Sequence, residues 1–154
     1  MTLPEDDPEM MEELIEWIYS HKYNPSKKTP TDDVCYGGFL NLFFFADKYD
    51  IRGLKGIVID ELVSALKTNS PLLSQTQVRQ IYKDTGLHSG LRKLAIDSWK
   101  TCVKVGWYAE ERNRDFFVEN PEITRDLLAA FTQSTQQGDR SADSLKAGDY
   151  YDAD

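Results

Sequence analysis

The segment of residues 39–46 constrains the fold of this chain most, because apolar side chains cover nearly every side of it. Its sequence is Phe-Leu-Asn-Leu-Phe-Phe-Phe-Ala. A helix that is apolar all round belongs at the centre of a core, since it has no face to offer to water. We therefore expect a buried helix over residues 39–49. The block is too short to cross a bilayer.

Helical spacing predicts elements that cover this block on both sides. Upstream, Asp7 is a capping residue and Pro8 fits the first helical position, which predicts a helix over residues 8–21. Downstream, a tight turn at residues 50–52 leads into a predicted helix over residues 54–66. Between the first two helices we expect a loop, a short extended piece at residues 34–36, and a break at Gly37 and Gly38.

The second half of the chain shows further helix signals. Ser74 and Gln77 form a capping-box pattern, and Gly86 is expected to end the helix that follows. Ser89 can cap the next helix, which Gly106 is expected to end. That helix has the clearest apolar stripe: Leu91, Leu94, Ala95, Ser98, Trp99 and Cys102. Residues 107–118 give a mixed pattern, and Asn120-Pro121-Glu122 begins a last helix that runs to about residue 132. The fold class predicted is mainly α.

Charge distribution argues against nucleic acid as a partner. The 154 residues carry 18 Lys and Arg against 26 Asp and Glu, a net charge of −8. An acidic surface repels phosphate backbones. The weakly basic face of the fifth predicted helix is interpreted as solvated, with Asp97 neutralising Lys93 from four residues away; its members are Arg92, Lys93, Lys100 and Lys104.

The residue types that carry chemistry form no recognisable motif. His21 and His88 are the only histidines, and Cys35 and Cys102 the only cysteines. No Cys-x-x-Cys or His-Glu-x-x-His spacing occurs, so no metal site is predicted. A thiol on an apolar stripe is inert. We therefore expect no catalytic residue, no cofactor and no enzymatic activity.

The remaining composition bears on location and on the ends of the chain. The acidic start lacks the apolar run of a signal peptide, and two distant cysteines suit a reducing compartment. We expect the cytoplasm or nucleus, and no membrane partner. From Ser134 onward the chain is polar and small, which predicts a disordered tail over residues 134–154.

Two blocks resemble BTB/POZ domains, and their wording is similar to the fungal branch of that family. Residues 5–9 (Glu-Asp-Asp-Pro-Glu) and 14–19 (Leu-Ile-Glu-Trp-Ile-Tyr) resemble the family's third helix. Residues 42–54 resemble its best-marked helix-turn-helix, with sequence Leu-Phe-Phe-Phe-Ala-Asp-Lys-Tyr-Asp-Ile-Arg-Gly-Leu. The resemblance implies the C-terminal part of a BTB/POZ-like domain over residues 1–68 and a helical extension over residues 69–133.

By the same resemblance the N-terminal half of the domain, with most of the usual dimer interface, is absent. We expect its absence to expose Leu14, Ile15, Ile18 and Phe43, which favours association. The function implied is non-catalytic protein binding, through self-association or a BTB partner. Two alternatives stay open: a substrate-adaptor fragment that contacts a cullin scaffold, and a small helical nucleic-acid-binding module. Family adaptors place the cullin contact at the end of the first helix, here Tyr19, His21 and Tyr23.

Overall fold

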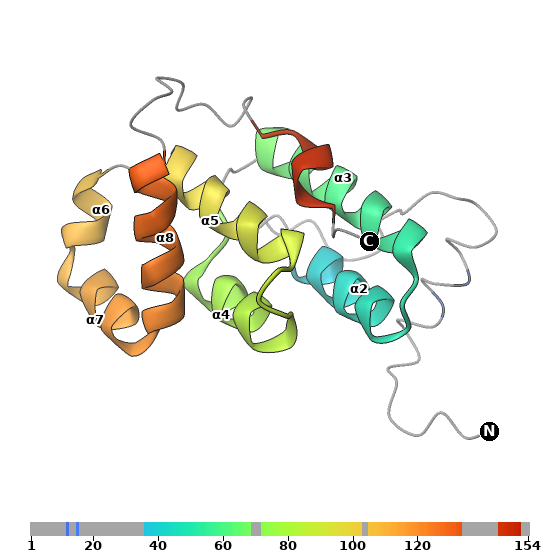
Figure 1. Cartoon of the computed structure of the whole chain (residues 1–154), viewed down its shortest axis with the longest axis horizontal. Coiled ribbons are helices and arrows are strands. Elements are labelled where there is room, and N and C mark those ends of the chain that lie inside the picture. The colour runs from blue at the N-terminus through green and yellow to red at the C-terminus, as the bar shows by residue number, and fades with distance from the viewer. Residues whose placement is uncertain are drawn as a thin grey trace.

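A computed structural model describes residues 12, 15, 36–68, 72–102, 105–133 and 145–151. This part of the chain contains helices and no strand, which confirms the mainly α class. Figure 1 shows α2 and α3 at one end, α4 and α5 in the middle, and α6 to α8 at the other end. A single hydrophobic cluster includes residues from both halves of the chain. No helix within the described ranges has the length and apolar character needed to cross a membrane.

The central apolar helix is confirmed as α2 (Tyr36–Lys48). Leu40, Leu42 and Ala46 are fully buried. The helix begins earlier than predicted, so the extended conformation expected at Tyr36 and the break at Gly37 and Gly38 are wrong. Burial of the Tyr36 ring contributes more than the roughly 1 kcal/mol that each helical glycine costs.

The tight turn after α2 is confirmed and leads into α3 (Arg52–Thr68). Asp50 adopts a left-handed backbone conformation with φ of 52°. The Ile51 amide donates to the Ala46 carbonyl at 2.8 Å, as in a helix C-cap. Lys55 Nζ lies 3.0 Å from Asp47 Oδ1 and links the two helices across the turn.

The capping box is confirmed at the start of α4 (Gln75–Asp84), where Ser74 and Gln77 satisfy each other's backbone amides. In α5 (Gly90–Cys102) the predicted stripe is buried through Trp99. The Trp99 indole also donates to the Leu73 carbonyl at 2.6 Å. This hydrogen bond holds the residues just before α4 against α5. The side chain of Cys102 lies outside the described residues.

Three short helices complete the helical part: α6 (Val105–Ala109), α7 (Glu111–Glu119) and α8 (Pro121–Gln133). Gly106 lies inside α6, so its predicted role as the end of the preceding helix is wrong. The reason is an aromatic cluster around Trp99, whose ring lies 5.6 Å from those of Trp107 and Phe116. Packing of Trp107 favours helix at a glycine that has weak preference of its own.

The tail prediction is wrong for residues 145–151. They include a 3-10 helix, η4 (Ala147–Tyr150), which lies across α3 and contacts α5 (Figure 1). Leu145 and Tyr150 are 2% and 3% exposed. The few apolar residues of this segment are therefore enough to dock it. Residues 134–144 and 152–154 lie outside the described residues.

The expected exposure of the first helix pair is also wrong for one of its four members. Phe43 is only 1% exposed and shares a depression with Ile59 of α3 and with Tyr150. Ile15 is helical and exposed. Leu14, Ile18 and most of the predicted helix over residues 8–21 lie outside the described residues.

Candidate functional site

The predicted partner-binding residues Tyr19, His21 and Tyr23 all lie outside the described residues, as does Cys35. The structure thus places none of them. It does bring together a polar cluster that the sequence did not predict, between the α4–α5 turn and α8.

This cluster borders a groove of about 380 Å³ between the α4–α5 turn, α5 and α8. We call it the α5–α8 groove. Its apolar lining is Leu87, Ile96, Ala129 and Ala130, and Leu87 is 65% exposed. Its polar lining is Tyr82, His88, Ser89, Arg92, Lys93, Asp97, Asp126 and Gln133.

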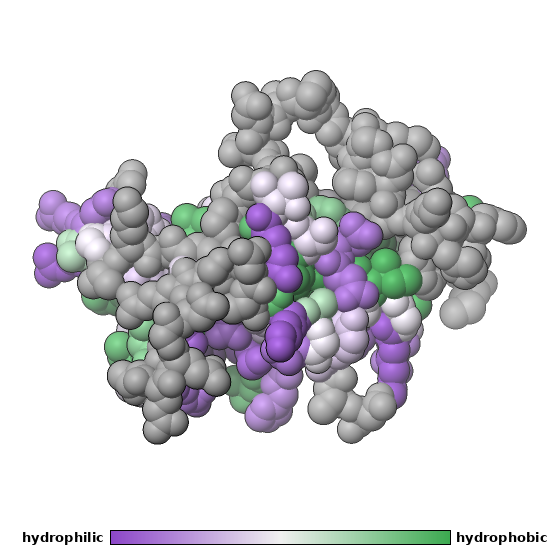
Figure 2. All heavy atoms as spheres, turned by 90° about the horizontal axis from the view of Figure 1, so that it is seen from above, coloured by the Kyte–Doolittle hydropathy of each residue, from purple (hydrophilic) through white to green (hydrophobic). Residues whose placement is uncertain are grey.

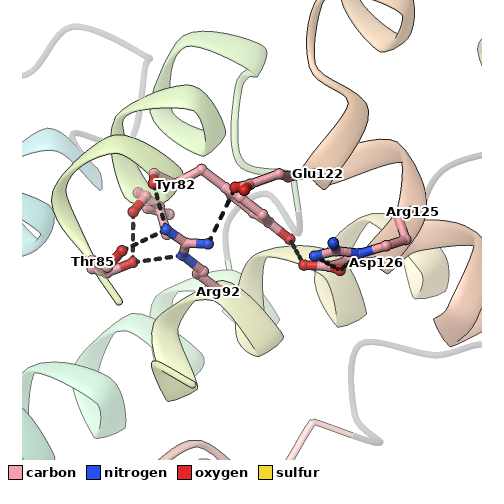
Figure 3. A network of polar contacts seen from close by, with 7 residues as sticks. Tyr82, Thr85, Arg92, Glu122, Arg125 and Asp126 are labelled. Carbon is pink, nitrogen blue, oxygen red and sulfur yellow. Dashed lines mark hydrogen bonds and ion pairs between the residues drawn. The ribbon is translucent and has the colours of Figure 1, made fainter. Parts of the chain in front are cut away.

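Arg92 contradicts the prediction of a solvated basic face, because the residue is only 8% exposed. Its Nε donates to the Thr85 hydroxyl at 3.2 Å. Its Nη2 donates to the backbone carbonyls of Tyr82 and Thr85 (Figure 3). These carbonyls lie at the C-terminal end of α4, where a cation is favoured by the helix dipole and by unpaired carbonyl groups.

The same guanidinium reaches α8. Its Nη1 lies 3.5 Å from Glu122 Oε2 and forms an ion pair, but this contact lacks hydrogen-bond geometry. The guanidinium carbon also lies 4.6 Å from the centre of the Tyr82 ring. Arg92 therefore joins α4, α5 and α8 through one buried cation, as Figure 3 shows.

Tyr82 makes the second link between α4 and α8. Its hydroxyl donates to Asp126 Oδ2 at 2.8 Å. Burial, followed by the hydrogen bond and the charge of Asp126, raises the pKa of the Tyr82 hydroxyl well above its ordinary value. The phenol therefore stays protonated at neutral pH and acts as a fixed hydrogen-bond donor.

Cations near the groove are paired with carboxylates. Lys93 Nζ lies 3.7 Å from Asp97 Oδ2, which confirms the predicted pair four residues apart. Arg79 pairs with Glu119 at 2.8 Å on the neighbouring surface. The groove is therefore of mixed charge, and both apolar and polar side chains line it.

The two side chains that link the helices beside this groove, Tyr82 and Arg92, act as hydrogen-bond donors. A protonated phenol and a guanidinium bound to carbonyl groups are donors, and neither is a nucleophile or a base. Across the described ranges, no group of three or more His, Cys, Asp or Glu side chains is placed to hold a metal ion.

One sequence signal could have revealed the burial of Arg92. The residue precedes Ala95, Ile96 and Trp99 by three, four and seven positions, which is the spacing of one helical face, and all three are buried. The overall charge balance drew the interpretation toward solvent. Its carbonyl partners could not be found from the sequence, because they depend on the path of the α4–α5 turn.

Figure 2 shows one face of the molecule, on which hydrophilic side chains alternate with small hydrophobic areas in the described part.

Comparison with known proteins gave no match: no family model, curated protein or solved structure matches this chain.

Proposed function

We propose that this chain is a non-catalytic protein-interaction module of BTB/POZ type, which self-associates or recruits a partner protein. The observation that carries the proposal is the α2–α3 hairpin. Residues 42–54, the second of the two blocks that carry the resemblance, form a buried helix, a left-handed turn at Asp50 and the start of a second helix. This is the element that the resemblance predicts at this position.

The α5–α8 groove supports the proposal as a contact surface. Leu87 stands 65% exposed at its rim, and the groove's cations and carboxylates are already balanced. A large exposed apolar side chain beside a polar rim is the composition of a protein-binding patch. We propose that the partner contacts this rim.

Binding of the purified full-length chain to two purified probes tests the function. The probes are a complete BTB domain and the N-terminal domain of a cullin, and light scattering also measures self-association. We expect at least one of these associations, and we expect Leu87→Asp to weaken binding of a probe at least tenfold. Val118→Asp is the matched control, because Val118 is 81% exposed and does not line the groove.

Association that is equally strong in the Leu87 and control variants would remove the groove from the proposal. Absence of every association would overturn the function itself. Under the cullin alternative, replacing Tyr19, His21 and Tyr23 together should abolish cullin binding. Binding that survives the triple replacement would refute that site.

The nucleic-acid alternative is tested by titrating the chain with duplex DNA at rising salt. True binding to a polyanion weakens steeply with salt, because counterions are released. The paired cations Arg79 and Lys93 argue against it. We expect no salt-dependent binding.

A further inference from the structure

The C-terminal segment of residues 145–151 packs into the groove between α3 and α5, beside the α5–α8 groove. Leu145 and Tyr150 are as buried as core residues, and Ala147 packs against the same cluster. The segment follows residues 134–144 and meets helices that lie far earlier in the chain. The segment is short, is remote in sequence from the helices that it contacts, and is held by its buried side chains. In these respects it resembles a bound peptide.

The segment contacts α5 through Lys93 and Asp97. Lys93 Nζ donates to the Asp149 carbonyl at 3.3 Å and lies 4.7 Å from the centre of the Tyr150 ring. Burial, followed by the charge and the hydrogen bond of Asp97, raises the pKa of the Tyr150 hydroxyl, so this phenol stays a donor. One lysine and one carboxylate of α5 therefore contact the segment at Asp149 and Tyr150.

The contacts to α3 involve the next residue. The Tyr151 hydroxyl donates to Asp60 Oδ1 at 2.7 Å, and a Cβ atom added to Gly56 would lie 4.0 Å from the Tyr151 ring. Tyr151 also lines a depression of about 400 Å³ with Arg52 and Lys55 of α3. Two basic residues of α3 thus border the depression beside Tyr151.

The site leaves no room for a side chain at position 90, because the backbone of Tyr150 lies against Gly90. A Cβ atom at this position would overlap the carbonyl group of Tyr150 and would lie 3.0 Å from its Cα. The overlapped atoms are backbone atoms, so no side-chain rotation can relieve the clash. Docking of the segment therefore requires glycine at the first position of α5.

We propose that the groove between α3 and α5 is a recognition site for a Leu-x-x-x-x-Tyr-Tyr segment, which the chain's own tail fills in cis and the tail of a second copy fills in trans. A second copy of the chain is the trans occupant that we propose, because its tail carries the same complementary side chains. Residues 134–144 have a covalent reach of roughly 40 Å, which suffices for exchange of a terminal segment between copies. This inference rests on the proposed function in one respect, because tail exchange would be the structural route of the proposed self-association.

Complementation between two full-length variants tests the exchange. Gly90→Ala blocks the groove and keeps the tail, whereas Tyr150→Ala keeps the groove and damages the tail. We expect each variant alone to be a monomer by light scattering, and an equimolar mixture to form a one-to-one complex. A mixture that stays monomeric, with both variants folded by circular dichroism, would overturn the exchange.

A fluorescent peptide of residues 143–154 tests the groove without any self-association. We expect the Tyr150→Ala chain to bind the peptide at least tenfold more tightly than the unmodified chain, whose own tail competes at a high effective concentration. Adding Gly90→Ala to that variant should remove the gain. If Tyr150→Ala fails to fold, Tyr150→Leu keeps an apolar side chain and replaces it in both assays.

The outcomes separate this inference from the proposed function. Peptide binding that ignores Gly90→Ala, or no saturable binding to a folded chain with a damaged tail, refutes the groove. Binding of the BTB and cullin probes by the same variants, measured in parallel, reports on the interaction function without relying on self-association. Loss of one result does not remove the other.

Discussion

Gly90→Ala should destabilise this chain, although alanine is the better helix former. In a helix, Ala is favoured over Gly by about 1 kcal/mol, so the substitution would stabilise an unobstructed position. Here the added Cβ would overlap the Tyr150 carbonyl group. The segment of residues 145–151 must then leave its groove.

The magnitude follows from what the segment buries. Leu145 and Tyr150 are 2% and 3% exposed, and burying two such side chains contributes roughly 3–6 kcal/mol. Part of this offsets the entropy of ordering the segment. We expect a net loss of about 2 kcal/mol, or roughly 4–8 °C in the midpoint of thermal unfolding for a chain of this size.

Two measurements check this prediction. Circular dichroism reports the thermal midpoint, and trypsin cleavage after Lys146 reports release of the segment. We expect cleavage to be at least tenfold faster in the Gly90 variant. Gly106→Ala is the control, because Gly106 lies within α6 with open space around it, and it should be neutral or stabilising. An unchanged midpoint together with unchanged cleavage at Lys146 would show that a Cβ atom at position 90 does not displace the segment.

Three further predictions concern the helical part of the chain. Arg92→Met removes the buried donors to the carbonyl groups at the end of α4 and should cost about 2–4 kcal/mol in urea unfolding; an unaltered midpoint would show that water replaces the guanidinium. Ser74→Ala breaks the capping box and should cost about 1 kcal/mol, whereas no loss would mean that the cap adds nothing to stability. Because burial and the Asp126 hydrogen bond raise the pKa of Tyr82 above its ordinary 10.0, the unfolded chain loses its proton first as pH rises, so stability should hold below pH 10 and fall above it. The fall should be shallower in Tyr82→Phe, and an equal slope in both chains would exclude Tyr82 as a cause.

Sequence patterns predicted the elements whose signals are local. The apolar block around Phe43 specified a core helix, and the spacing of Leu91, Leu94 and Trp99 specified the buried face of α5. Ser74 and Gln77 marked a helix start to the residue. These features depend on side chains within one or two helical turns, so a linear pattern contains all the information that they need.

The features that were missed depend on distant contacts. Arg92 is buried because the turn after α4 brings the Thr85 carbonyl to it. The C-terminal segment docks because Lys93 and Asp149, 56 residues apart, meet across the fold. Composition alone suggested disorder there, because the segment has few apolar residues. A linear pattern cannot show that each of these residues is buried against helices from earlier in the chain.

Light scattering of the unmodified chain over a range of concentrations, alone and mixed with the BTB and cullin probes, tests the proposed interaction function most directly. We expect a mass above the 17.7 kDa of one chain, either from self-association at high concentration or from a complex with a probe. A mass of 17.7 kDa at every concentration, with no complex with either probe, would contradict it.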